Sequence, residues 1–392
     1  MKAAAPDWLF KPQDLTLARE YREFWSIPVI FAPLRDPAPG FATQHDEFAI
    51  SYSRAEAINK VQEFLRSENE RQARQQFSLC AQSQWQYKRA KEELAKLDLT
   101  AHAKEITYRP YDDRWTIWDR NVAVHRRLRV SHHLLIDNLA LIVAKNAGAI
   151  GSDAYDGTSI AAKPVELNYF RRGGEYVFPI YMRADEDSTA TGERIESLAS
   201  DFRAFIDSRY EHHYTPEEIL GYIYAILYAA SYRTRYAEFL RMGFPRIPFS
   251  QSADDFEELS GLGWALMQAH LLRELPRRGL AAYPVRGDHI VEFVRYSPAE
   301  QAIAINKTQS FKPVSQAVWD FHIGGYPVLD KYLKSRKGRI LSLDEIEHVG
   351  AVADSLAFTI EQMAKNRRGV QGGVSRSGMT RPTSSVWKRR DA

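Results

Sequence analysis

The segment that most constrains the fold is residues 215–230, which read TPEEILGYIYAILYAA. Thr215 followed three residues later by Glu218 is a capping box, and Pro216 between them favours the first turn of a helix. Beyond it, apolar side chains occupy nearly every face, so other parts of the chain must surround this helix. The apolar run of residues 219–230 is too short to cross a bilayer. We therefore predict a deeply buried helix inside a folded core.

The length and composition of the chain fit a soluble globular protein. With 392 residues, of which 44% are hydrophobic and 26% charged, it can build about two to three domains. Its single cysteine, Cys80, excludes an internal disulfide, a cysteine-based zinc cluster and a CxxC redox pair. The N-terminal sequence MKAAAPDWLFKPQDL lacks the apolar stretch of a signal peptide. These features predict a cytoplasmic protein with no membrane partner.

Changes in composition divide the chain into four parts. Residues 1–53, with scattered proline and glycine, predict an irregular N-terminal wrap that includes a short strand at residues 45–51. Residues 54–100 show the apolar periodicity of a helical spacer. Residues 101–366 predict a mixed α/β domain with segregated helices, so the fold class is α+β. Residues 367–392 predict a disordered basic tail.

Within the mixed domain, the predicted strands come first. Residues 106–119 read ITYRPYDDRWTIWD and predict a hairpin that turns at Asp112-Asp113. The apolar residues 138–145 predict a strand buried on both faces, and Gly173-Gly174 predicts a second hairpin tip. The later predicted features are a helix capped by Ser252, a helix capped by Ser342 with Glu345, and strands at residues 289–295 and 302–306.

Positive charge is concentrated at the C-terminal end. From Lys365 onward the chain has eight Lys or Arg residues and one acid, a net charge of +7, so residues 1–364 sum to −4. A flexible basic tail can bind phosphates without sequence preference, and a merely solvated end is an equally open interpretation. Any nucleic-acid site in the body therefore requires cations clustered on one face.

The motifs of common enzymes are missing. The sequence has no GxxxxGK[ST] phosphate loop and no GxSxG elbow. Gly261-x-Gly263 and Gly324-Gly325 lack the spacing of a dinucleotide fingerprint, and helix packing and turns explain them better. His132-His133 and His212-His213 are adjacent pairs whose side chains diverge, which disfavours a shared metal ion. We expect no catalytic residues, no cofactor and no metal ion.

Arginines interleaved with aromatic residues are the binding signal. A guanidinium group suits phosphates and guanine edges, and it stacks on aromatic rings. For Arg109 and Arg114, DNA contact and ion pairs with nearby aspartates are equally open. The candidates that favour DNA contact are Arg126, Arg127 and Arg129 in one run, and Arg171 and Arg172 at the second predicted hairpin tip.

Four blocks of this sequence resemble one protein family. They read YRPYDDRW (108–115), TPEEILGYIYAILYAASYRTRYAEFLRMGFPRIPF (215–249), VWDFHIGGYPVLDKYLKSRKGR (318–339) and LSLDEIEHV (341–349). Together they are similar to the C-terminal specificity region of type ISP restriction–modification enzymes, in order over roughly residues 8–365. In that family one polypeptide joins a nuclease, an ATP-driven translocase, an adenine methyltransferase and a target-recognition domain.

This chain has no helicase motifs, no S-adenosylmethionine glycine motif and no NPPY-type tetrapeptide. The resemblance therefore implies the recognition region alone. We expect sequence-specific binding of double-stranded DNA that directs an adenine methyltransferase, with or without a nuclease–translocase, supplied by another chain. Two alternatives stay open, namely a diverged methyltransferase or nuclease fragment, and a protein-binding scaffold without DNA affinity.

Overall fold

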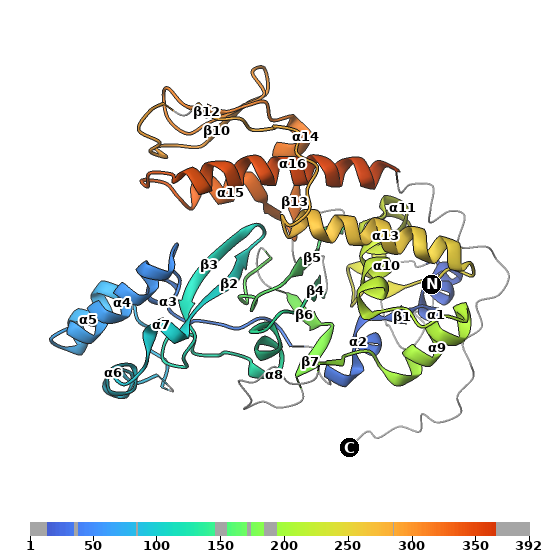
Figure 1. The fold of residues 1–392 in the computed structure, drawn as a ribbon, viewed down its shortest axis with the longest axis horizontal. Helices are drawn as coiled ribbons and strands as arrows, with labels where there is room; N and C mark the ends of the chain where they lie inside the picture. The colour runs from blue at the N-terminus through green and yellow to red at the C-terminus, as the bar shows by residue number, and fades with distance from the viewer. Residues whose placement is uncertain are drawn as a thin grey trace.

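The computed structural model describes residues 14–34, 38–83, 85–145, 155–170, 174–183, 194–284 and 286–365. These residues form an α+β fold in which the strands make small separate sheets of two or three strands each. Figure 1 shows a lobe of short helices at one end, a central region that holds the main core, and a C-terminal lobe above both. The predicted fold class is confirmed, whereas the domain boundary at residue 100 stays a prediction. The predicted basic tail lies outside the described residues.

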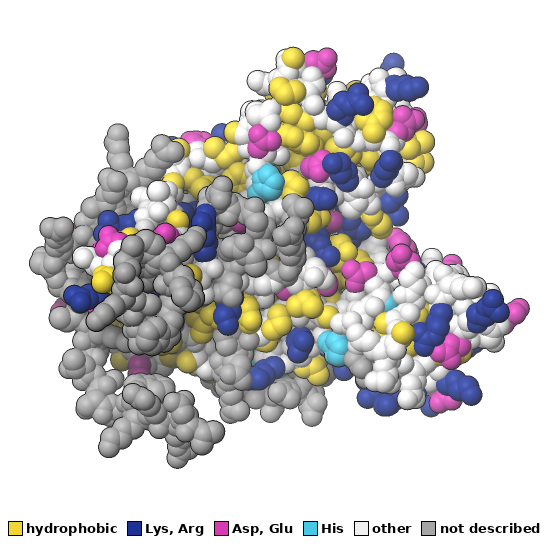
Figure 2. Space-filling model, turned by 180° about the vertical axis from the view of Figure 1, so that it is seen from behind, with side chains coloured by type: hydrophobic (Ala, Val, Ile, Leu, Met, Phe, Trp, Pro, Cys, Tyr) yellow, Lys and Arg dark blue, Asp and Glu magenta, His cyan; other side chains and the backbone are white. Residues whose placement is uncertain are grey.

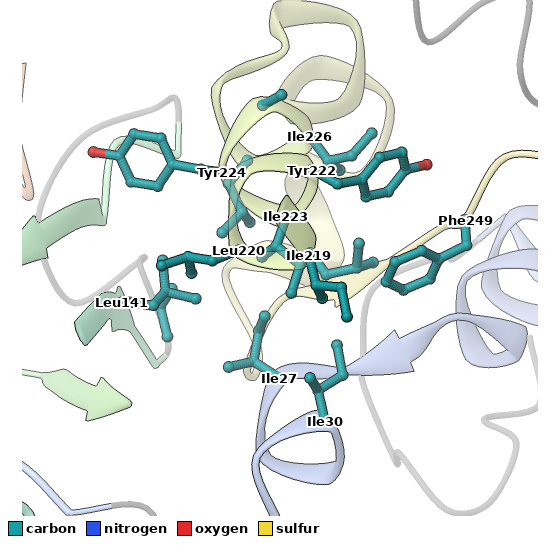
Figure 3. Close-up of a cluster of buried hydrophobic side chains, with 14 of the residues drawn as sticks. Ile27, Ile30, Leu141, Ile219, Leu220, Tyr222, Ile223, Tyr224, Ile226 and Phe249 are labelled. Carbon is teal, nitrogen blue, oxygen red and sulfur yellow. The ribbon is translucent and has the colours of Figure 1, made fainter. Parts of the chain in front are cut away.

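The central core is built around α10 (Pro216–Tyr228). Its predicted capping box is present, because the Thr215 hydroxyl accepts from the Glu218 amide at 3.2 Å and the Glu218 carboxylate accepts from the Thr215 amide at 2.7 Å. Every residue from Ile219 to Tyr228 is buried. Figure 3 shows Ile27 and Leu141, from other elements, pointing toward this helix. The prediction of a helix surrounded on all faces is confirmed.

Two glycines let α10 cross α13 (Ala253–His270) at close range. A Cβ atom added to Gly263 would lie 1.8 Å from the carbonyl oxygen of Gly221, and one added to Gly221 would lie 2.5 Å from the carbonyl oxygen of Ser260. The side chain of Ser252 caps α13 by accepting from the Asp255 amide, as predicted. Gly263 therefore serves helix packing, which was the interpretation favoured from the sequence.

The N-terminal segment does more than wrap the surface. Helices α1 (Leu15–Glu23) and α2 (Ile27–Ile30) contribute buried residues to the central core, and β1 (Trp25–Ser26) pairs with β9 (Arg246–Ile247). Three further helices contribute to the same core: α9 (Ser200–Tyr210), α11 (Ala230–Arg235) and α12 (Ala237–Leu240).

The helical lobe contains α4 (Arg54–Arg66), α5 (Glu70–Phe77), α6 (Tyr87–Leu94) and α7 (Leu99–His102). It has its own aromatic core, in which Phe48, Phe64 and Trp85 are buried. The strand predicted at residues 45–51 is wrong, because helix α3 (Asp46–Ala49) occupies it and places Phe48 in that core. Only Ser51 bonds like a strand, through a bridge to Trp115.

The first predicted hairpin forms with a different turn. Strands β2 (Ala103–Arg109) and β3 (Asp112–Ile117) are antiparallel, and Asp112 already pairs with Arg109. The predicted turn at Asp112-Asp113 is therefore wrong. The chain reverses at Pro110 and Tyr111 instead, and Tyr111 adopts a left-handed φ of 58°. Asp112 is consequently a buried strand residue rather than a solvated turn residue.

The second predicted hairpin is also wrong within the described residues. β6 (Glu175–Pro179) pairs with β4 (Ala140–Ala144), which also pairs with β5 (Thr158–Ala161), so the sheet order is β5-β4-β6. No strand lies between β5 and β6 in the described residues. Beside this sheet, β7 (Tyr181–Arg183) pairs with β8 (Arg194–Glu196). The predicted buried strand at residues 138–145 is confirmed by β4, all of whose residues are buried.

The C-terminal lobe combines a small sheet with three helices. The sheet contains β10 (Arg295–Ser297), β11 (Ala302–Ala304) and β12 (Ser310–Phe311), so the strand predicted at residues 289–295 begins only at its last residue. The helices are α14 (Gln316–Trp319), α15 (Val328–Lys334) and α16 (Leu343–Lys365). Ser342 and Glu345 exchange backbone–side-chain hydrogen bonds at the start of α16, as the predicted capping box requires.

A glycine turn fastens the C-terminal lobe to the central region. It joins β13 (His322–Ile323) to β14 (Tyr326–Pro327), and Gly324 and Gly325 both have positive φ. The Gly324 amide donates to the Asp156 carbonyl oxygen at 2.9 Å, and the Gly325 amide donates to the Asp156 carboxylate at 2.8 Å. These two glycines therefore serve a turn, as expected from the sequence. Within the described ranges, none of the helices combines the length and apolarity that a membrane span needs.

Candidate nucleic-acid interface

The first two candidate arginines lie on the β2–β3 hairpin and are occupied by protein contacts. Arg109 forms a salt bridge with the buried Glu166, and its guanidinium lies 3.8 Å from the centre of the Tyr108 ring. Arg114 donates through Nε and Nη2 to the two carboxylate oxygens of Asp112, at 2.7 and 2.6 Å. Arg114 is only 3% exposed. The ion-pair interpretation of Arg114 therefore agrees with the structure, and a DNA contact by this buried side chain does not.

Asp112 is the centre of a cluster that joins the hairpin to the C-terminal lobe. Besides the two bonds from Arg114, it accepts one from Nη2 of Arg336 at 3.1 Å. Arg336 also donates through Nε to Glu345 at 2.7 Å. Burial alone would favour the neutral acid, but the two guanidinium groups lower the pKa of Asp112 below its usual value. Two arginines and two carboxylates thus balance each other, three of them buried and Glu345 partly exposed, and we call these four residues the Asp112 cluster.

Tyr52 connects the helical lobe to the same place. Its ring centre lies 3.6 Å from the guanidinium carbon of Arg114 and 3.7 Å from that of Arg339. Two planar groups at such distances must occupy opposite faces of the ring, because one face has no room for both. The Tyr52 hydroxyl donates to the carbonyl oxygen of Ser335. The helical lobe, the β2–β3 hairpin and the α15–α16 turn therefore meet at Tyr52, and Figure 2 shows a notch between the helical lobe and the C-terminal lobe.

The third candidate group forms a loop before α8 (Leu128–Ser131). Arg126 is half-buried, whereas Arg127 and Arg129 are exposed and Leu128 between them is 44% exposed. Paired hydrogen bonds between His125 and Ala42 hold the start of the loop, and the amides of Val130 and Ser131 donate to the Arg127 carbonyl oxygen. We call residues 126–129 the arginine loop.

Arg127 has an unusual backbone conformation. Its φ of 49° lies in the left-handed region, which costs a residue with a side chain on the order of 1 kcal/mol or more. Arg127 lies between the two anchors of the loop, at the position that directly precedes α8. Eight other described non-glycine residues also have a positive φ, so this conformation does not by itself mark a binding site.

The last two candidates, Arg171 and Arg172, lie outside the described residues. The residue that follows this segment, Gly174, is described, and so is Glu175, which is fully buried. Neither carboxylate oxygen of Glu175 has a hydrogen-bond partner among the described residues. Burial raises the pKa of Glu175 to about 8, so this side chain is largely protonated at neutral pH.

The candidate arginines that the structure describes do not form one site. The β2–β3 hairpin points toward the C-terminal lobe, whereas α8 lies at the opposite edge of the central region (Figure 1). Sequence reasoning also missed exposed cations on the C-terminal lobe, namely Lys331, Lys337 and Arg339. The sequence does carry a signal for them, since residues 331–343 hold five Lys or Arg residues and no acid.

The histidine pairs considered from the sequence do not suggest a metal site. His132 and His133 lie side by side with ring centres 4.1 Å apart, and each bonds to nearby protein groups instead. Across the part of the chain that the structure describes, no three His, Cys, Asp or Glu residues gather in a way that could hold a metal ion.

Comparison with known proteins places the chain in a family. Residues 34–364 match the sequence profile of the Type ISP C-terminal specificity domain. The chain belongs to this family. The match covers the hairpin, the arginine loop and the C-terminal lobe, so the Type ISP specificity domain includes every described candidate residue named above. Among curated protein sequences, no match was found.

Solved structures share the fold at low sequence identity. The DrdV–DNA complex matches with a TM-score of 0.67 at 17% identity, and the aligned region covers 94% of this chain and 40% of the DrdV chain. The ATP-dependent Type ISP restriction–modification enzyme LlaBIII bound to DNA has a TM-score of 0.67 at 15% identity, covering 92% and 25%. A nuclease-deletion mutant of the Type ISP enzyme LlaGI with a DNA substrate mimic has a TM-score of 0.61 at 16% identity, covering 92% and 29%. The chain thus spans two fifths or less of these proteins.

Proposed function

We propose that this chain binds double-stranded DNA in a sequence-specific manner, as the target-recognition part of a restriction–modification enzyme. The observation that carries the proposal is the match of residues 34–364 to the Type ISP specificity domain. The three structural neighbours, which share its fold, are all complexes with DNA or a DNA mimic. The recognised DNA would direct an adenine methyltransferase, with or without a nuclease–translocase, that lies outside these 392 residues.

The arginine loop is the part of the described surface that best fits this function. Its anchored backbone presents Arg127 and Arg129 at the surface in a fixed conformation, which reduces the entropy lost on binding. Arginine can contact phosphates or donate two hydrogen bonds to a guanine edge. Leu128 offers an apolar side chain for the thymine methyl group. Arg109, Arg171 and Arg172 remain secondary candidates, whereas Arg114 belongs to the protein interior.

Binding titrations with cognate and scrambled duplexes over a salt series test the proposal. A phosphate contact by Arg127 or Arg129 predicts that the alanine variant loses affinity equally for both duplexes and that the slope of log affinity against log salt shrinks by about 1. A base contact predicts a loss of about 1–3 kcal/mol for the cognate duplex only. Arg71→Ala, at an exposed position on α5 in the helical lobe, is the matched control and should leave both quantities unchanged.

Two results would count against DNA recognition by this chain. A scaffold that binds only proteins predicts no salt-dependent DNA affinity for the wild-type chain. A diverged methyltransferase predicts methyl transfer from S-adenosylmethionine to duplex DNA by the purified chain without any partner. We expect salt-dependent binding and no methyl transfer.

A further inference from the structure

Helix α15 and the turn that follows it expose positive charge that has no carboxylate partner among the described residues. Of the five cations in residues 331–343, Arg336 belongs to the Asp112 cluster and Lys334 pairs with Asp330 at 2.8 Å. Lys331, Lys337 and Arg339 are exposed, and none of the three has a carboxylate partner among the described residues. Dark-blue side chains accordingly gather on the C-terminal lobe, which borders the notch at the upper right of Figure 2.

The backbone of this turn is held rigidly. The amide of Val291 donates to the Arg339 carbonyl oxygen at 3.0 Å, and the amide of Gly338 donates to the Val291 carbonyl oxygen at 2.8 Å. Inside the turn, Arg336 is buried in the Asp112 cluster. Lys337 and Arg339 therefore lie on a turn that Val291 and the Asp112 cluster hold, and Lys331 lies on the preceding helix α15.

Arg339 is also held at its side chain. Its guanidinium stacks on the Tyr52 ring, whose other face is covered by Arg114. A stacked arginine keeps its hydrogen-bond donors available at the ring edge while losing little further side-chain freedom on binding. An exposed arginine that the free protein already positions in this way suits an anionic partner.

We propose that Lys331, Lys337 and Arg339 form a second contact with the DNA backbone, separate from the arginine loop, in which Tyr52 positions Arg339. This inference rests on the proposed function. Phosphate is the favoured partner because residues 331–339 hold these three exposed cations and no acid, which matches the negative charge of the DNA backbone. The surface would fix the register of the duplex on the protein and would carry no sequence preference of its own.

The decisive comparison uses two double variants that remove the same charge. Lys331→Gln with Lys337→Gln should reduce the salt slope by about 2 and should weaken cognate and scrambled duplexes by the same factor. Lys88→Gln with Lys96→Gln changes two exposed lysines, one on α6 and one just after it, which lie away from the notch. This control should match the wild type. Melting temperatures of all variants show whether the fold is retained.

The positioning role of Tyr52 needs its own test. Tyr52→Leu removes the stack and should lower DNA affinity as Arg339→Gln does, and the double variant should lose no more than either single variant. Tyr52→Phe keeps the ring and should bind like the wild type. A full additive loss in the double variant would refute the positioning role.

The outcomes separate this inference from the proposed function. If the wild type shows no salt-dependent DNA binding, the proposed function itself fails. If the wild type binds but the Lys331 and Lys337 double variant behaves like its control, only the second contact is overturned. Normal DNA binding with lost association to a methyltransferase would also overturn it, because the surface would then serve a protein.

Discussion

The close crossing of α10 and α13 makes a sharp prediction about two glycines on one helix. Gly263 lies against α10, and a Cβ atom there would meet only backbone, namely the carbonyl group of Gly221 and the amide nitrogen of Ala225 at 2.9 Å. Gly261 lies two residues earlier on the exposed face, and a Cβ atom there would meet nothing within 4 Å. Alanine at either position gains about 0.5–1 kcal/mol as the better helix former.

The difference between the two alanine variants therefore isolates the cost of forcing the helices apart. Overpacking a close-packed core costs about 1–3 kcal/mol, and the contact of 1.8 Å with a backbone oxygen, which cannot swing aside, points to the upper end. We expect Gly261→Ala to raise the free energy of unfolding by about 0.5–1 kcal/mol. The free energy of unfolding of Gly263→Ala should be about 3 kcal/mol lower than that of Gly261→Ala.

Urea unfolding followed by circular dichroism measures both variants under identical conditions. The dependence of the unfolding free energy on urea should stay unchanged, because neither substitution alters the surface exposed on unfolding. If Gly263→Ala proved as stable as Gly261→Ala, the helices would not cross as closely as described. The reasoning from the two glycines would then be wrong.

Three further predictions concern other parts of the chain. Asp112→Ala should lower the free energy of unfolding by about 3–5 kcal/mol, because it leaves the buried Arg114 and Arg336 without their shared acceptor. Urea unfolding checks this prediction, with Asp112→Asn, which keeps one acceptor oxygen, measured beside it. Burial lowers the pKa of His270 to about 3, so between about pH 6.5 and 3 the unfolded chain binds a proton at His270 and the folded chain does not. The free energy of unfolding should therefore fall as the pH drops through that range. In thermal melts, a His270→Gln variant should show a smaller decrease in melting temperature over the same pH range. Deleting residues 367–392 should weaken binding to all duplexes alike and flatten the salt slope; an altered sequence preference with an unchanged slope would contradict a generic phosphate anchor.

Helix starts could be predicted because their signals are local. The capping boxes at Thr215 and Ser342 and the cap at Ser252 all use residues within three positions of each other. The true position of the β2–β3 turn could not be predicted, because Tyr111 adopts a left-handed conformation that its residue type does not favour. Tyr111 is held there by distant groups, since its hydroxyl bonds to Ser355 and its carbonyl oxygen to His348.

The candidate site shows the same division between local and distant information. The arginine loop is exposed, as a polar run beside a short helix usually is, and its contact with DNA stays a prediction. Arg114 is buried instead, since its neighbour Asp112 is shared with Arg336, more than two hundred residues further along the chain. Nothing in the sequence around Arg114 reveals that partner. Lys331, Lys337 and Arg339 lie in a block that the sequence analysis used only for the family resemblance, so their charges were not considered as a site.

The Asp112 cluster bears on how such chains can exchange their specificity. Recombination between two relatives at any point between Arg114 and Ser335 would join the hairpin of one parent to the α15–α16 turn of the other. Unless both parents carry the same carboxylate and guanidinium partners, such a hybrid buries an unmatched charge and loses stability. The segment inherited as a working unit is therefore residues 52–345, and a graft that starts at the predicted boundary near residue 100 would separate Tyr52 from its two arginines.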